Sequence, residues 1–121
     1  MDRYQVVYYQ RANGDCPVED YLLSIDTKLS AKVYRFLELI SEFGSELREP
    51  YSKHLDDGIF ELRVSLATTY VRILYFYSGS RCVILTNGFT KKKQKTPINE
   101  IARAKAYRKD YLERSGENEN S

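Results

Sequence analysis

The stretch that decides the fold is IFELRVSL at residues 59–66, followed closely by YVRILYFY at 70–77 and CVILTN at 82–87. All three runs are rich in β-branched and aromatic residues, which favour strands. The segments between them, 67–69 and 78–80, are very short, and short connections join antiparallel neighbours. We therefore predict three consecutive antiparallel strands.

Charged residues interrupt these apolar runs on one face of the predicted sheet. Successive side chains of a strand point to opposite faces, so Glu61 and Arg63 share one face while the apolar residues around them occupy the other. Arg72 lies among apolar neighbours in the second run. Removing a guanidinium from water without an anionic partner is costly. Arg72 therefore needs an anion, which is either Glu61 in an internal ion pair or a bound ligand.

Upstream of these strands the sequence predicts one more strand and two helices. Residues 4–9 have the composition of a strand. Pro17 suits the first turn of a short helix, and residues 29–43 carry apolar side chains at helical spacing, with Gly44 placed to cap the helix end. We expect the two helices to form a hairpin and residues 45–58 to form a polar connection.

The C-terminal part of the chain predicts a last helix. It is expected to begin with Thr96 as N-cap and Pro97 at the first helical position. Residues 1–114 then form a single α+β domain of order βααβββα, an antiparallel sheet covered on one face by the helical hairpin. Residues 115–121 contain no apolar side chain and are expected to be disordered.

Length and composition exclude several classes of protein. A chain of 121 residues with 42% hydrophobic and 30% charged residues suits one small domain. The apolar runs are far shorter than the roughly 20 residues of a membrane span, and the N-terminus lacks a secretory pattern, so we expect a cytoplasmic protein. Cys16 and Cys82 are too isolated to indicate a disulfide framework or a zinc site.

The net charge of +2 conceals an uneven distribution of charge. Residues 1–90 hold ten basic and twelve acidic side chains, whereas residues 91–114 hold nine basic and three acidic ones. The tail, 115–121, holds two acidic side chains and no basic one. The excess of +6 in residues 91–114 indicates either a surface that binds a polyanion or a solvated helix face.

Catalytic motifs with nucleotide-binding glycines, a nucleophilic serine elbow or zinc-binding histidines are missing from the sequence. His54 is the single histidine, and acidic residues do not cluster at metal-ligand spacing, so we expect no metal and no cofactor. Any catalysis must therefore depend on cationic groups. Three clusters supply them: Lys53 with His54; Glu61, Arg63 and Arg72; and Lys91, Lys92, Lys93 and Lys95.

Several of these side chains suit RNA. Lysines can bind RNA phosphates as point charges, and His54 can contact a phosphate or carry a proton, although a lone loop histidine commonly does neither. Some aromatic side chains can stack on bases, although most aromatics in a small domain belong to the core. The aromatic candidates are Tyr51, Tyr70, Tyr75, Tyr77 and Phe89.

Two strings of sequence resemble a known family. KHLDDGIFELR at 53–63, followed by VRILY at 71–75, resembles the RelE/ParE toxin superfamily. NGFTKKKQKTP at 87–97 resembles its phage-derived, HigB-like branch in particular. The resemblance implies a type II toxin of a toxin–antitoxin pair, with a RelE-like sheet of the microbial-ribonuclease type.

The resemblance also implies a reaction. RelE-type toxins cleave translated mRNA in the ribosomal A site without a metal: the ribose 2′-hydroxyl attacks the adjacent phosphate, giving a 2′,3′-cyclic phosphate and a 5′-hydroxyl. Arg72 matches the arginine that contacts the scissile phosphate, Arg63 matches the arginine of the ELR-like strand, and Lys91 or Lys92 matches the basic pair beyond the final strand. We expect Arg72 and Lys92 to stabilise the phosphorane and Arg63 to position the backbone.

The acid and base of this reaction are less directly implied. Glu61 stands where RelE-like enzymes carry a lysine, so the base is either this carboxylate or Lys95, kept partly neutral by its cationic neighbours. The catalytic tyrosine of the family has no counterpart near Thr96, which leaves the general acid unassigned. Lys53, His54, Lys91 and Lys93 are expected to bind RNA.

The implied partners are a cognate antitoxin, often a helix-turn-helix protein in this branch, together with the ribosome and its mRNA. Two alternatives remain open. One is a gyrase poison of the ParE type, and the other is a catalytically degenerate relative that only binds its antitoxin. Retention of Arg63, Arg72 and the lysine run favours the nuclease over both.

Overall fold

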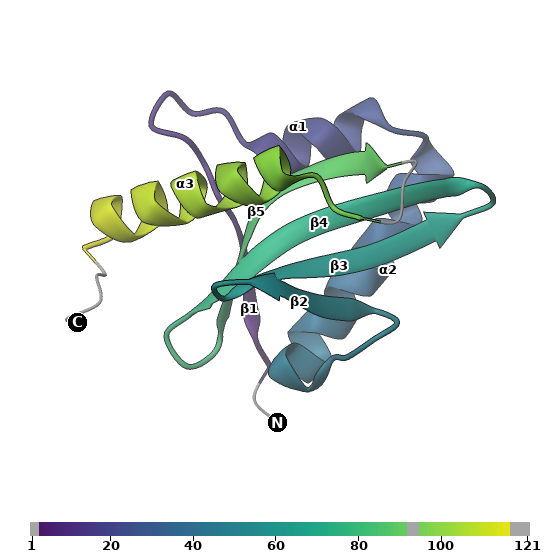
Figure 1. Cartoon of the computed structure of the whole chain (residues 1–121). Helices are drawn as coiled ribbons and strands as arrows, with labels where there is room; N and C mark the ends of the chain where they lie inside the picture. Colours follow the sequence, from purple (N-terminus) through teal and green to yellow (C-terminus); the bar gives the residue numbers. More distant parts are fainter. Residues whose placement is uncertain (1–2, 92–94, 117–121) are drawn as a thin grey trace.

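A computed structural model describes residues 3–91 and 95–116, and its arrangement is shown in Figure 1. The fold is α+β, as predicted. The elements in chain order are β1 (Gln5–Tyr8), α1 (Pro17–Ser24), α2 (Thr27–Phe43), the short 3-10 helix η1 (Gly44–Glu46), β2 (Ser52–Asp56), β3 (Ile59–Leu66), β4 (Thr69–Ser78), β5 (Cys82–Lys91) and α3 (Ile98–Arg114).

The five strands form one sheet in the order β1-β5-β4-β3-β2. The predicted antiparallel neighbours β3, β4 and β5 form its centre, and β1 joins β5 in parallel. The prediction of a polar connection over 45–58 was wrong in one respect, because Ser52–Asp56 forms β2, antiparallel to β3. As an edge strand, β2 exposes most of its side chains and lacks the apolar alternation that marks a half-buried strand.

The helical hairpin covers one face of the sheet. Apolar side chains of α1 and α2 pack on alternate residues of β3, β4 and β5, including Leu62, Ile73 and Leu85. Gly44 ends α2 as expected, with φ of 52°, and a Cβ at this position would overlap the ring of Tyr4. Glycine is required there for both reasons.

Helix α3, whose place the sequence did not predict, packs on the opposite face of the sheet (Figure 1). Ala104 on α3 is fully buried in a cluster with Ile59, Leu74 and Ile84. This contact covers the part of the face that carries apolar side chains. The charged residues of β3 and β4 occupy the rest of the same face.

The start of α3 differs from the prediction. The helix begins at Ile98, and Pro97 is its N-cap with no side-chain cap hydrogen bond. Thr96, which was predicted to be the cap, instead donates its hydroxyl hydrogen bond to the carboxylate of Glu61. A hydrogen bond to a charged acceptor is stronger than one to a neutral backbone group, so the buried carboxylate takes the hydroxyl.

Several other expectations concern the ends of elements and the tail. Strand β5 extends to Lys91, beyond the predicted end at Asn87. Of the tail 115–121, Ser115 still donates its backbone N–H to Tyr111, while residues 117–121 lie outside the described residues. Cys16 is a free thiol. No helix in the described part of the chain is long and apolar enough to cross a membrane.

Candidate functional site

The charged face of the sheet is built by the register of β3 and β4. Arg63 and Arg72 are paired directly across the two strands. Like charges in such a position repel each other. Glu61, two residues before Arg63 and therefore on the same face, lies between them: its Oε2 is 3.2 Å from Nε of Arg63 and its Oε1 is 3.6 Å from Nε of Arg72. The predicted internal partner of Arg72 is therefore present.

Glu61 is an unusually buried carboxylate. Its side chain is 1% exposed, and the hydroxyl of Thr96 is a third partner beside the two arginines. A buried charge is tolerated when it is both paired and hydrogen-bonded. Glu61 therefore fixes the two guanidinium groups relative to each other and ties the start of α3 to the sheet.

Arg72 is nearly as buried as Glu61. The residue is 8% exposed, and its Nη1 donates to the carbonyl of Val71 at 3.0 Å. Burial lowers the pKa of Arg72, which the nearby charge of Glu61 opposes. Within the described residues, neither Nε of Arg63 nor Nε of Arg72 forms a hydrogen bond of good geometry. Glu61 thus serves both guanidinium groups, and the exposed Glu49 is a second acidic partner of Arg63.

Lys91 adds a third cation at the end of β5. It pairs across the strands with Tyr70 and is 6% exposed. Burial is the largest cause that lowers the pKa of Lys91; the attraction of Glu61 opposes the shift, and repulsion by neighbouring cations, above all Arg72 and Arg63, adds to it. The amine of Lys91 therefore loses its proton at a lower pH than an exposed lysine does.

Two hollows flank Arg63. One, of about 240 Å³, is lined by Pro50, Arg63, Val64, Ser65, Tyr70 and Arg72. The other, of about 200 Å³, includes Lys53, His54, Glu61, Arg63, Lys95 and Thr96 in its lining. Both are open to solvent on the charged face. The structure thus brings most of the predicted site residues into one region, with Arg63 at the boundary between the hollows.

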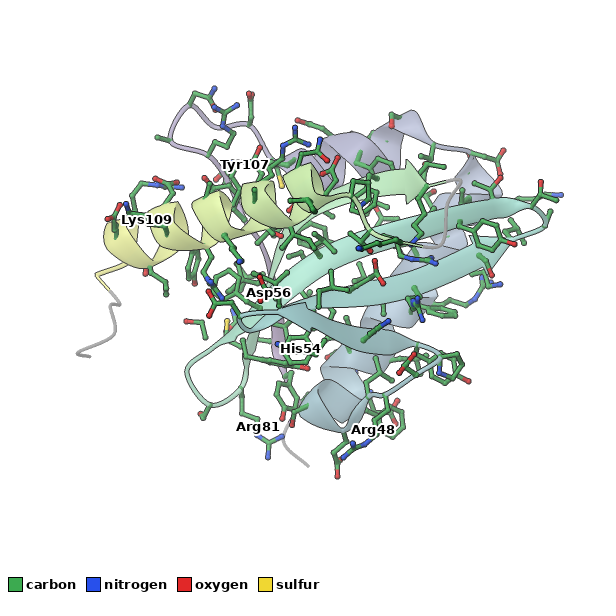
Figure 2. The ribbon with its side chains drawn as sticks, in the orientation of Figure 1. Arg48, His54, Asp56, Arg81, Tyr107 and Lys109 are labelled. Carbon is green, nitrogen blue, oxygen red and sulfur yellow. The ribbon has the colours of Figure 1, made fainter. Side chains whose placement is uncertain are left out.

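Some predicted residues have other surroundings. Figure 2 shows His54 and Asp56 along β2. Nε2 of His54 accepts a hydrogen bond from the backbone N–H of Gly58 at 3.1 Å, and its ring contacts Phe60 edge to face. This acceptor is already used to close the turn between β2 and β3. Lys92 and Lys93 lie outside the described residues.

The basic residues of α3 are largely paired with acidic ones. Lys105 contacts Asp56 at 2.5 Å and Arg108 contacts Asp57 at 2.8 Å, which fastens the β2–β3 turn to the helix. Arg103 and Arg114 pair with acidic residues within α3 itself. Nearby carboxylates therefore neutralise much of the positive charge that residues 91–114 place on α3, whereas the charged face of the sheet keeps a net positive charge.

The sequence did not reveal every residue of the site. Thr96 was predicted as a helix cap, and no signal in the sequence marks it as a partner of Glu61. Pro50 and Glu49 were not singled out, although Glu49 accepts from Nη1 of Arg63 at 3.4 Å at the rim of the site. Both precede β2, so they could be placed near Arg63 only once that edge strand was recognised.

Within residues 3–91 and 95–116, no three His, Cys, Asp or Glu side chains gather in a way that could hold a metal ion. A comparison with curated proteins finds no significant match. The sequence model of the phage-derived Gp49-like proteins (DUF891) matches residues 20–109, which include part of α1, all of α2, the charged strands and most of α3. The chain belongs to this family, a toxin–antitoxin toxin family of RelE-like type.

Proposed function

We propose that this protein is a HigB-like toxin that cleaves mRNA on the ribosome without a metal ion. The observation that carries the proposal is the pairing of Arg63 and Arg72 with one buried carboxylate, whose charge also acts on the buried Lys91, on a part of the sheet face that lies beside two open hollows. Membership of the Gp49-like family supports the toxin assignment. The antitoxin, the ribosome and the mRNA are the proposed partners.

The arrangement suits phosphoryl chemistry. Attack of a 2′-hydroxyl on the adjacent phosphate produces a phosphorane with increased negative charge, and fixed cations stabilise such a charge most when they need not reorganise. Arg63 and Arg72 are held in place by Glu61 before any substrate arrives. In this proposal the two arginines, with Lys92, bind the phosphorane. Glu61 is a positioning residue that acts through them.

The general base is the second element of the proposal. Glu61 is buried and already engaged by three partners, which makes its oxygens poor acceptors for a substrate proton. Lys91, which pairs with Tyr70 across the strands on the same face, is the base in this proposal, because burial lowers its pKa and a lowered pKa favours acceptance of the 2′-hydroxyl proton. Lys95 is exposed in the second hollow together with Lys53, and both suit contacts with the RNA backbone.

The experiment is a translation reaction with purified toxin, followed by primer extension along the message. Wild-type protein is expected to produce breaks linked to codons, and Arg72→Ala is expected to lose at least 100-fold in cleavage rate, in line with the loss of a main electrostatic group. Arg35→Ala is the matched control, because Arg35 is exposed on α2, on the other side of the sheet.

Four results would oppose the proposal. Absence of codon-linked cleavage by the wild-type protein contradicts the nuclease assignment. Undiminished cleavage by Arg72→Ala contradicts the assigned site. Gyrase-dependent DNA breaks in place of RNA cleavage favour the ParE-like alternative, and protein that is harmless in both assays but binds its antitoxin favours the degenerate one.

A further inference from the structure

The hollow of about 240 Å³ beside Arg63 has an aromatic wall. Tyr70, near the start of β4, is 44% exposed and lies on the same face as Arg72, two residues further along the strand. The guanidinium carbon of Arg72 is 6.0 Å from the centroid of the Tyr70 ring. On the neighbouring strand β3, Tyr70 is paired with Ser65, whose small side chain leaves space beside the ring.

The opposite side of the hollow is formed by Pro50. The backbone N–H of Arg63 donates to the carbonyl of Tyr51 at 2.8 Å, so the chain that leads into β2 already runs alongside β3. Pro50 and Tyr70 therefore flank β3 on its two sides. Neighbouring strands lie about 4.8 Å apart, so the two flanking backbones are separated by about 10 Å across the floor of β3. That width admits one flat ring.

Charge and shape divide the hollow into two ends. Arg63 and Arg72 supply positive charge at one end, while Tyr70 and Pro50 supply apolar surface at the other. A nucleotide has the same division, with an anionic phosphate linked through a sugar to a flat base. Glu49, which is 63% exposed and 3.4 Å from Nη1 of Arg63, is the acidic group at this rim.

We propose that this hollow is the subsite for the base of a nucleotide next to the reactive phosphate, and that the ring of Tyr70 is the surface on which this base stacks. The inference rests on the proposed function and adds a base-binding residue to it. Stacking on a tyrosine is possible for every base, so this subsite contributes affinity for a nucleotide whichever base it carries. The phosphate of the same nucleotide then lies against Arg63 and Arg72.

Tyr70 is distinguished from the other aromatic candidates by its surroundings. Tyr51 is equally exposed, at 43%, but its ring packs edge to face on Phe36 at 5.7 Å and does not line the hollow. Tyr75 is fully buried, and Tyr77 packs against it within the core. Tyr51 is therefore a matched control for a substitution of Tyr70.

The test is an NMR titration of the full chain with adenosine 5′-monophosphate and, separately, with ribose 5-phosphate, which lacks the base. Wild-type protein is expected to bind the nucleotide about tenfold more tightly than the sugar phosphate, the contribution of one stacked base. Tyr70→Ala is expected to lose this difference while it keeps its affinity for ribose 5-phosphate. Tyr70→Phe, which retains the ring, and Tyr51→Ala are expected to behave like the wild type.

The proposal is overturned if the wild type binds both compounds equally, if Tyr70→Ala keeps the difference, or if Tyr51→Ala loses it as well. Loss of ribose 5-phosphate binding by Tyr70→Ala, with Tyr70→Phe unchanged, would also overturn it, since the ring would then support the arginines rather than a base. The titration needs neither ribosome nor cleavage. Failure to cleave mRNA would therefore contradict the proposed function, whereas failure of the titration would contradict the base subsite, and the two failures can be told apart.

Discussion

Glu61→Gln keeps the shape of the side chain and removes its charge from between Arg63 and Arg72. Removing one partner of a buried ion pair typically costs 3–5 kcal/mol, because the remaining charge is left uncompensated. The side chain of Arg63 is 24% exposed and also contacts Glu49, so its charge is partly compensated, whereas the side chain of Arg72 is only 9% exposed. We therefore expect a loss near the lower end, about 3 kcal/mol.

This loss can be measured by urea unfolding and by thermal unfolding. For a chain of this size 1 kcal/mol corresponds to about 4 °C, so the unfolding midpoint should fall by about 12 °C. Glu38→Gln is the matched control: Glu38 pairs with Arg3 at 3.4 Å, but both side chains are largely exposed. Such surface pairs contribute about 0.5 kcal/mol or less.

A double substitution separates the charge from the packing. In Glu61→Gln combined with Arg72→Gln, neither buried charge remains in the pair, so the total loss should be smaller than the sum of the two single losses by at least 1 kcal/mol. The reasoning is refuted if Glu61→Gln costs less than 1 kcal/mol, or if the two losses simply add. Either result would show that Glu61 does not hold the arginines in place.

Three further predictions concern the same face and the core. Thr96→Val should cost about 2 kcal/mol in urea unfolding, because a hydrogen bond to a buried charge is lost, and a loss no larger than that of an exposed Thr68→Val would contradict the contact. Lys91→Met should abolish cleavage, because it removes the amine that accepts the 2′-hydroxyl proton in the proposed reaction; a rate equal to the wild type would exclude Lys91 as the base. Burial raises the pKa of Tyr8 from 10.0 to about 12, so the unfolded chain loses this proton at a lower pH than the folded protein does. The free energy of unfolding, measured in urea, should therefore decrease between pH 10 and pH 12, and it should decrease less in Tyr8→Phe.

The central strands could be predicted from the sequence because their runs are rich in β-branched and aromatic residues and are joined by very short connections, which favour antiparallel neighbours. The strand Ile59–Leu66 has the predicted boundaries, and the expectation that Arg72 needs an anion led directly to Glu61. The second inference depends on the free-energy cost of burying a guanidinium without an anion. That cost is a property of arginine itself, so it predicts that Arg72 has a partner before the partner is identified.

The parts that were not predicted depend on tertiary contacts. Strand β2 is held by its backbone pairing with β3, and its polar side chains give no period of two. The last residues of β5 extend the strand because β4 continues beside them as far as Tyr70. Thr96 was available both to cap α3 and to reach Glu61, and only the folded chain brings the stronger acceptor within reach.

The measurement that tests the central claim most directly uses an mRNA with one modified nucleotide. The nucleotide on the 5′ side of the cleaved bond is replaced by its 2′-deoxy analogue, and ribosome-bound cleavage by the wild-type protein is compared with that of the unmodified message. If the cationic face promotes attack by the 2′-hydroxyl, the unmodified message is cut to give a 5′-hydroxyl end and the modified message is not cut at this bond. Equal cleavage of the two messages would contradict the account.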